Sequence, residues 1–312
     1  MLVAIADLAA DTAATRDPER PGRYHVTLPD HWDYLLPSGG VVMTAALRVA
    51  EAALGDPNLR LASASTIFCT PIGSGPLVAD AVILRRGGST AQLRVSLRNR
   101  DAPVVPAQAG GAAAPEAGAQ TGMELLVTFC RDRKGPDVKG LAYPRVRALK
   151  DSPNADDDAP NNPHARFRFY RQVETRIAAG ERYWTDGLVA GPPVYARWMR
   201  YKTPQRDAQG RLDRLALPPL IDTMPTALHR AIGPGAYRFY APSLDLTTYC
   251  VDDTTREWLL VAVTLQRARA GWAVADAEVW DDEGRFVAYG AQAMYLHGLA
   301  GEPPIVDASE RT

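Results

Sequence analysis

The sequence contains an internal repeat, and this feature most limits how the chain can fold. When residues 43–48 (MTAALR) are placed over residues 224–229 (MPTALH), an offset of 181 aligns the two halves without a gap for about 55 residues. The same offset places residues 77–86 over residues 258–267, and both segments have the side-chain pattern of strands. A repeat of this length predicts two copies of one domain rather than two unrelated domains.

The composition is that of a globular protein and excludes several kinds of partner. The 312 residues include 35 Lys and Arg against 36 Asp and Glu, a net charge of −1, so no long-range field favours nucleic acid. No run of about 18 apolar residues is present, so we expect no membrane span. The three cysteines are widely spaced and the five histidines form no cluster, so we expect no metal. The first residues lack a basic region, which favours a cytoplasmic protein over a secreted one.

Two segments interrupt the repeat. Residues 101–122 (DAPVVPAQAGGAAAPEAGAQTG) have almost no large side chains and cannot bury enough apolar area to offset the entropy of ordering. We therefore expect a disordered insertion at a hairpin tip. Residues 150–164 are rich in Asp, Asn and Pro, which is typical of a linker. The predicted organisation is an N-terminal domain over residues 1–149, a linker over 150–164 and a C-terminal domain over 165–312.

Both halves have the same order of elements. Residues 40–54 and 221–232 are predicted to be helices, and three or four alternating strands follow each helix. Further strands are expected over residues 166–176 and 194–202, which alternate and are rich in aromatic residues. One helix before a run of antiparallel strands is an α+β pattern. Because each half has a single helix to cover one sheet face, the sheet is expected to wrap around it.

Several short motifs follow one another in a characteristic order. In the first half, Ser38-Gly39-Gly40 opens the helix and residues 84–89 (LRRGGS) form a turn between strands. In the second half, residues 220–222 (LID) open the helix, residues 242–247 (PSLDLT) form a strand, and a hairpin at residues 281–288 (DDEGRFVA) precedes Gln292. On these motifs each half resembles a hotdog domain, and the whole chain is similar to the double-hotdog type II acyl-CoA thioesterases and the wider thioesterase-like superfamily.

The resemblance implies two tandem hotdog domains, packed as an intramolecular double hotdog, and an enzyme of lipid metabolism that hydrolyses a fatty-acyl or related acyl-CoA. In that family a carboxylate, a hydroxyl and a glutamine amide position the attacking water. The motif match carries these roles to Asp222, Ser243 and Gln292, with Ser243 where the family often has Thr. These groups suit the chemistry, because the water needs a proton acceptor and oriented hydrogen-bond partners. Read without the family, Asp222 is an ordinary helix N-cap.

A second group of residues is expected to bind the substrate, with CoA present only as part of it. The glycines at the first helix start offer backbone N–H groups to a developing oxyanion. The turn after Arg85 offers guanidinium and N–H groups to CoA phosphates, or is simply a solvated turn. These candidate residues are Gly39, Gly40, Arg86, Gly88, Ser89 and Asp245. Since the outer sheet faces of this family often associate, a homo-oligomer is also possible.

Two other functions stay open. Hotdog dehydratases or hydratases act on acyl thioesters with a histidine and a carboxylate, but no histidine here occupies a helix start as Asp222 does. A non-catalytic protein that binds acyl or polyketide groups would keep the channel without the chemistry. This sequence also departs from the family at Leu246, often His, and at Ala293-Met294, often Glu-Gly. Hydration of enoyl-CoA, or acyl-CoA binding without turnover, would distinguish these alternatives.

Overall fold

The computed structural model describes residues 5–102, 104–105, 118–119, 121–158, 161–185, 187–234 and 237–306. The first half contains α1 (Leu8–Asp11), β1 (Thr15–Arg16), β2 (Arg23–Leu28), α2 (Gly39–Leu54), β3 (Arg60–Phe68), β4 (Gly75–Arg86), β5 (Thr90–Asn99), β6 (Val104–Val105), β7 (Gly118–Ala119) and β8 (Met123–Cys130). The second half contains β9 (Val173–Ala179), β10 (Val194–Tyr201), α3 (Pro218–Ile221), α4 (Pro225–Ile232), β11 (Arg238–Tyr240), β12 (Asp245–Cys250), β13 (Leu259–Arg269), β14 (Trp272–Asp281), β15 (Phe286–Tyr295) and β16 (His297–Ala300). Short 3-10 turns lie at Asp30–Trp32, Leu149–Asp151, Ala155–Asp158, Phe169–Arg171 and Arg214–Ala216.

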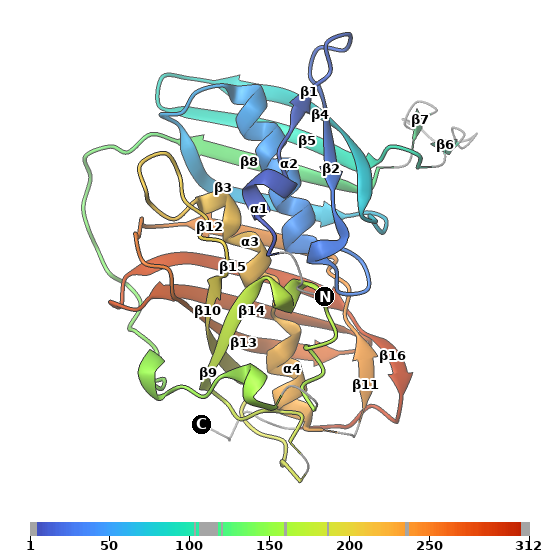
Figure 1. The fold of residues 1–312 in the computed structure, drawn as a ribbon, viewed down its shortest axis with the longest axis vertical. Helices are drawn as coiled ribbons and strands as arrows, with labels where there is room; N and C mark the ends of the chain where they lie inside the picture. The colour runs from blue at the N-terminus through green and yellow to red at the C-terminus, as the bar shows by residue number, and fades with distance from the viewer. Residues whose placement is uncertain are drawn as a thin grey trace.

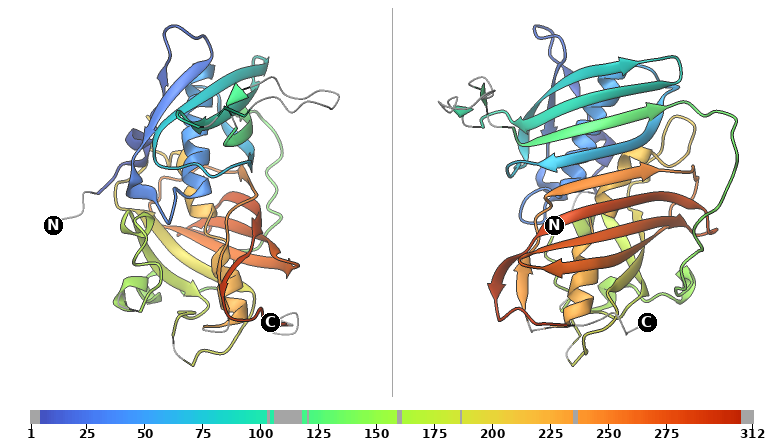
Figure 2. Two further views of the ribbon diagram at one scale, coloured as in Figure 1. Left: turned by 90° about the vertical axis from the view of Figure 1, so that its right-hand side faces the viewer. Right: turned by 180° about the vertical axis from the view of Figure 1, so that it is seen from behind.

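One antiparallel sheet of twelve strands runs through both halves. Its order is β1-β2-β4-β5-β8-β3-β12-β15-β14-β13-β10-β9, so β3 and β12 join the halves at its centre. The strands of both halves follow one another down the molecule (Figure 2, right), and the helices lie on one face of the sheet (Figure 1). The arrangement confirms the predicted α+β class with a sheet wrapped around helices. No helix in the described ranges is long and apolar enough to cross a membrane.

Helix α2 confirms the prediction for residues 40–54. The hydroxyl of Ser38 accepts a hydrogen bond from the N–H of Val41 at 3.2 Å and so begins the helix. Gly55, with a φ of 60°, ends it in the left-handed conformation. From Gly40 to Ala50 every residue except Arg48 is buried, because the sheet covers the helix and α3 packs against its N-terminal part.

Equivalent residues of the two halves are 182 positions apart in the structure, one more than the sequence comparison indicates. At the junction, Ser65 of β3 lies opposite Thr247 of β12, 182 residues further on, and their hydroxyl oxygens are 2.8 Å apart. The β-bulges that begin at Ile83 and Leu265 are displaced by the same 182 residues. Side chains alternate between sheet faces, so an odd offset would exchange the buried and exposed faces of one copy. The repeat is confirmed, but the offset of 181 is wrong by one.

Two predicted elements of the second half also differ from the structure. The helix expected over residues 221–232 is broken into α3 and α4 by residues 222–224, because Pro225 has no N–H to continue the helical ladder. The strand expected over residues 166–176 begins only at Val173, and a 3-10 turn at Phe169–Arg171 precedes it. The strand expected over 194–202 is confirmed as β10.

The predicted linker joins the two halves, and the predicted insertion lies between the neighbouring inner strands β5 and β8. Within the predicted insertion, residues 103, 106–117 and 120 lie outside the described residues, and β6 pairs with β7 at its two ends. The predicted linker carries 3-10 turns, and Ser152, Ala155 and Asn162 are buried in it. Asn154 also forms an isolated bridge with Arg176 of β9, so this part of the connection packs against the second half.

Candidate active site

The three residues predicted to hold water meet in one hydrogen-bonded cluster. Asp222 ends α3, Ser243 precedes β12 and Gln292 lies within β15. The Ser243 hydroxyl donates to Oδ1 of Asp222 at 3.1 Å. The Nε2 amide of Gln292 donates to the same oxygen at 2.5 Å and lies 2.6 Å from Ser243 Oγ. The chain therefore brings together side chains separated by up to 70 residues in sequence.

The carboxylate of Asp222 also joins the two halves of the molecule. Its second oxygen, Oδ2, accepts the backbone N–H of Gly40 at 2.8 Å, in the first turn of α2. The first N–H groups of a helix have no partner within it and carry the positive end of the helix dipole, which favours an anion there. Asp222 does not cap α4, whose N-cap position is Met224 without a side-chain hydrogen bond. It caps the helix of the other half instead.

Two consecutive glycines make this approach possible. A Cβ at Gly40 would lie 2.6 Å from the Cα of Pro219 in α3, and still closer to the carbonyl oxygen of Pro218. A Cβ at Gly39 would lie 2.8 Å from the ring of Phe68 and 3.2 Å from Ser243 Oγ. The predicted role of these glycines was oxyanion binding. In the structure the N–H of Gly40 is already bonded to Asp222, and both residues allow α2 to approach the cluster closely.

Burial and hydrogen bonding shift the pKa of the Asp222 carboxyl group in opposite directions. The residue is only 8% exposed, and this desolvation raises the pKa of its carboxyl group. Hydrogen bonds from Gly40, Gln292 and Ser243 stabilise the anion and lower the pKa, but burial prevails. A carboxylate with a raised pKa is a stronger base than an exposed one, and perturbed carboxyl groups of this kind are characteristic of catalytic sites.

Gln292 has one polar atom that nothing in the structure engages. The residue is 2% exposed, and its Oε1 oxygen is buried without a hydrogen-bond partner, while Nε2 serves Asp222 and Ser243. A buried carbonyl oxygen left without a donor is costly and is normally satisfied by protein or water. This free acceptor, beside a carboxylate and a hydroxyl, suits a bound water molecule.

Of the two copies of the repeat, the second carries the acid, the hydroxyl and the amide of this cluster. In the structural register, the positions that correspond to the three clustered residues in the first half are Gly40, Leu61 and Val127. None of them carries a polar side chain, so the symmetry-related position has no acid–hydroxyl–amide arrangement. Of the two equivalent positions, both in the described part of the chain, only that of Asp222 carries the cluster, to which the first half contributes the start of α2.

The remaining predicted substrate-binding residues lie apart from Asp222. Asp245 accepts the N–H of Ala293 at 2.7 Å and so fixes the backbone next to Gln292 without touching the cluster. The turn that contains Arg86, Gly88 and Ser89 lies beyond the other end of α2, where Arg86 is 4.0 Å from Asp56. At 1.5 Å per residue, the length of α2 separates this turn from Gly40 by about 24 Å.

The motifs did not identify an aromatic and basic group near the cluster. The pKa of Tyr34 is raised well above its usual value, chiefly by burial and also by its neighbour Tyr170 and the charge of Asp222. Tyr170 in turn accepts a hydrogen bond from Arg197 of β10 at 3.0 Å. The sequence signal was the alternation along β10, which places an arginine on the same face as apolar and aromatic residues.

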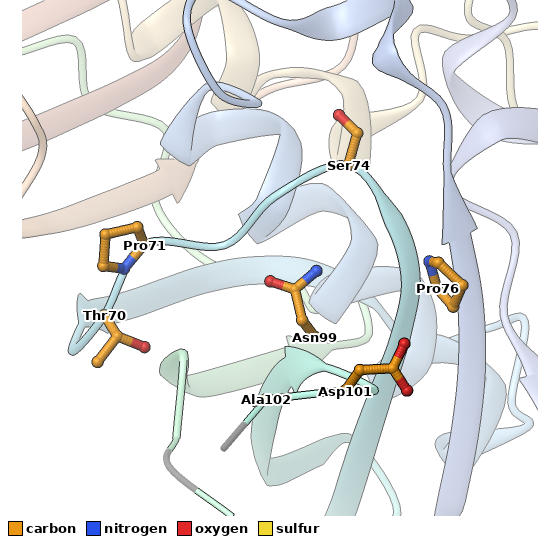
Figure 3. A pocket seen from close by; sticks show the side chains of 7 residues that line it. All are labelled: Thr70, Pro71, Ser74, Pro76, Asn99, Asp101 and Ala102. Carbon is orange, nitrogen blue, oxygen red and sulfur yellow. The ribbon is translucent and has the colours of Figure 1, made fainter.

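A surface pocket of about 330 Å³ lies near the loop between β3 and β4 (Figure 3). It is lined by Thr70, Pro71, Ser74, Pro76, Asn99, Asp101 and Ala102, at the point where the chain leaves β5 for the insertion. Ser74 donates to Asp33 at 2.6 Å, which connects the pocket rim to the segment that carries Tyr34. None of the clustered polar residues lines this pocket.

The chain was compared with known families and structures. Models of the acyl-CoA thioesterase N-terminal and C-terminal domains match residues 28–110 and 148–296. A protein of unknown function with a hotdog fold from Alicyclobacillus acidocaldarius has a TM-score of 0.73 at 17% identity, over 96% of this chain and 98% of that chain. A candidate thioesterase from Novosphingobium aromaticivorans has a TM-score of 0.68 at 22% identity, over 92% and 99%.

An acyl-CoA thioesterase II from Mycobacterium marinum has a TM-score of 0.65 at 17% identity, over 95% of this chain and all of that chain. No curated protein sequence matches the chain. At these identities the structural likeness shows the fold, and it confirms the tandem hotdog arrangement expected from the sequence.

Proposed function

Because the chain belongs to the acyl-CoA thioesterase family, we propose that it hydrolyses the thioester bond of an acyl-CoA to give a carboxylic acid and CoA. The observation that carries this proposal is the cluster of Asp222, Ser243 and Gln292 at the start of α2. It contains a buried proton acceptor, two orienting groups and a helix N-terminus, which are the groups that a water-mediated hydrolysis needs.

In the proposed reaction Asp222 accepts a proton from the attacking water. The hydroxyl of Ser243 and the amide of Gln292, with its unengaged Oε1, hold that water against the thioester carbonyl. The water oxygen bonds to the carbonyl carbon, and the carbon–sulfur bond then breaks. The proton held by Asp222 passes to the CoA sulfur, so Asp222 is restored and no acyl-enzyme bond forms.

The first turn of α2 contributes electrostatically. The positive end of its dipole points to the cluster, where it stabilises the ionised form of Asp222 and the negative charge that develops on the carbonyl oxygen. The two glycines permit this geometry, because a side chain at either position would meet Phe68 or α3.

The cluster argues against the dehydratase alternative. That chemistry uses a histidine beside the carboxylate, and within the described ranges no histidine is hydrogen-bonded to Asp222, whose side-chain partners are Ser243 and Gln292. The position of Leu246, often His in the family, is buried and apolar in β12.

The proposal is tested by thiol release from a panel of acyl-CoAs of different chain length, with wild type and the Asp222→Ala variant. Hydrolysis of at least one member by wild type, reduced by about a hundredfold or more in the variant, is expected for a lost general base. Asp276→Ala is the matched control, since Asp276 is also a carboxyl group with a pKa raised by burial but bonds to Gln266 on β13. Equal activity of wild type and Asp222→Ala would show that the assignment is wrong.

A further inference from the structure

Arg197 is a buried cation in the interior of the second half. It lies in β10, is 3% exposed, and faces the main core together with Tyr195 and Met199. Its Nη1 donates to the hydroxyl of Tyr170 at 3.0 Å. The guanidinium carbon lies 5.6 Å from the centre of the Tyr170 ring and 5.8 Å from that of Tyr195, within the range of cation–π attraction.

No carboxylate pairs with this charge among the described residues. The Nη2 atom of Arg197 is buried without a hydrogen-bond partner, and so is the hydroxyl of Tyr195, whose ring lies near the guanidinium. Two other arginines that are largely buried each pair with a carboxylate, Arg48 with Asp213 and Arg214 with Asp253. The tyrosines do not supply an anion, because burial raises the pKa of Tyr195 above its usual value. A buried charge is costly unless an opposite charge compensates it, so Arg197 is suited to bind an anion.

Arg197 is connected to Asp222 through two aromatic side chains. The rings of Tyr170 and Tyr34 are 5.6 Å apart, and the charges of both Asp222 and Arg197 act on the Tyr34 hydroxyl. Phe169 stacks on Tyr34 at 5.2 Å. Tyr34 and Tyr170 each keep part of their surface accessible, whereas Arg197 behind them is buried. The side chains of Tyr34 and Tyr170 thus lie between the polar cluster at Asp222 and the unpaired cation of Arg197.

We propose that Arg197 binds a carboxylate carried by the acyl group, so that the preferred substrate is the CoA thioester of a dicarboxylic acid. This inference rests on the proposed function and names its substrate class. The planar guanidinium matches a carboxylate, and its Nη2 is free to donate. Tyr195, whose ring lies 5.8 Å from the guanidinium carbon, has a buried hydroxyl that is also without a partner. The carbon chain between the two carboxyl carbons would lie along the rings of Tyr34 and Tyr170.

The test compares adipyl-CoA with hexanoyl-CoA, which has the same number of carbons but a methyl end. Wild type is expected to hydrolyse adipyl-CoA with the higher kcat/KM. In Arg197→Met this kcat/KM falls by about tenfold to a hundredfold, as for a lost charged hydrogen bond, while that of hexanoyl-CoA is unchanged or higher. Arg200→Met is the matched control, because Arg200 lies on the same strand but pairs with Glu174 and Glu257.

Methionine is close to arginine in shape, and replacing a buried charge by an apolar group is often neutral for stability, so the variant is expected to fold. Arg197→Lys is the second variant. It keeps the charge without the planar fork, and we expect an intermediate loss on adipyl-CoA only. An unchanged adipyl to hexanoyl ratio in both variants would overturn the proposal. So would a wild-type preference for hexanoyl-CoA, or for ω-hydroxyhexanoyl-CoA, whose end group is neutral.

Equilibrium binding separates this proposal from the proposed function. Wild type should bind free adipate more tightly than neutral adipamide, and Arg197→Met should lose that difference. If no thioester is hydrolysed but the difference in binding is present, the hydrolase assignment fails and the carboxylate site stands. If thioesters are hydrolysed but adipate and adipamide bind alike, the carboxylate site fails and the hydrolase assignment stands.

Discussion

Substitution of Gly40 by alanine tests how closely the two halves must approach to form the cluster. The added methyl carbon would lie 2.6 Å from the Cα of Pro219, where ordinary contacts begin at 3.4 Å. The methyl carbon is fixed to the backbone of α2 and the Cα of Pro219 belongs to the backbone of α3, so neither can rotate away and the two helices must separate by about 1 Å. That movement lengthens the 2.8 Å hydrogen bond from Gly40 N–H to Asp222 Oδ2 beyond its useful range.

Three energetic contributions decide the outcome. Overpacking costs about 1–3 kcal/mol. The lost hydrogen bond to a charged group costs about 1.5–3 kcal/mol. Alanine gains about 1 kcal/mol over glycine in a helix. The free energy of unfolding should therefore fall by about 1.5–5 kcal/mol, as measured by urea denaturation. The kcat for thioester hydrolysis should fall as well, because Asp222 loses a donor that fixes its carboxylate.

Gly73→Ala is the control, because a Cβ there would meet only the side chain of Asn99, at 4.0 Å, and no positive φ is involved. If Gly40→Ala is as stable and as active as Gly73→Ala, the close approach of α2 to Asp222 plays no part in the site, and our account of the two glycines is refuted.

Two further predictions follow from ionised groups. Because burial raises the pKa of Asp222, the acid limb of the kcat/KM profile for acyl-CoA hydrolysis should have its midpoint above the usual range of aspartate; a rate that stays constant down through that range would contradict a base at Asp222. Asp253, on which Arg60, Arg211 and Arg214 converge, has its pKa lowered to about 2, with burial opposing and the arginines prevailing. A lowered pKa stabilises the fold at neutral pH, and this contribution disappears as the pH falls through about 2. At pH 7 the free energy of unfolding of Asp253→Asn, measured by urea denaturation, should therefore be about 2 kcal/mol lower than that of wild type. This difference should shrink as the pH falls toward about 2. A difference that stays constant over that fall in pH would contradict the lowered pKa of Asp253.

The sequence was sufficient to locate the polar cluster. Asp222, Ser243 and Gln292 each stand in a short motif of the family that the chain resembles. This match located them, although Asp222 ends α3 instead of opening a helix and Ser243 precedes β12 instead of lying in a strand. The tandem architecture was likewise visible, since the repeat preserves the order of the elements in both halves.

Features that depend on contacts between distant segments could not be predicted in the same way. The bond from Gly40 to Asp222 joins residues 182 positions apart and exists only because β3 and β12 pair. The repeat register was missed by one residue, because few aligned residues are identical and only strand pairing fixes the face. Arg197 was not singled out, because an arginine in an alternating strand is ordinarily solvated, and its lack of a carboxylate partner is a property of the folded chain.

In the proposed reaction the Asp222 carboxylate activates the water that cleaves an acyl-CoA. The most direct measurement is kcat for the best acyl-CoA substrate with wild type and Asp222→Asn, a variant that keeps the shape of the side chain. Its fold should persist at neutral pH, because the raised pKa of Asp222 means that the charged form destabilises the native state there. Gln292 can also turn its unengaged Oε1 toward the new amide. We predict a stably folded variant whose kcat is lower by about a hundredfold or more; a folded Asp222→Asn with the kcat of wild type would contradict the account.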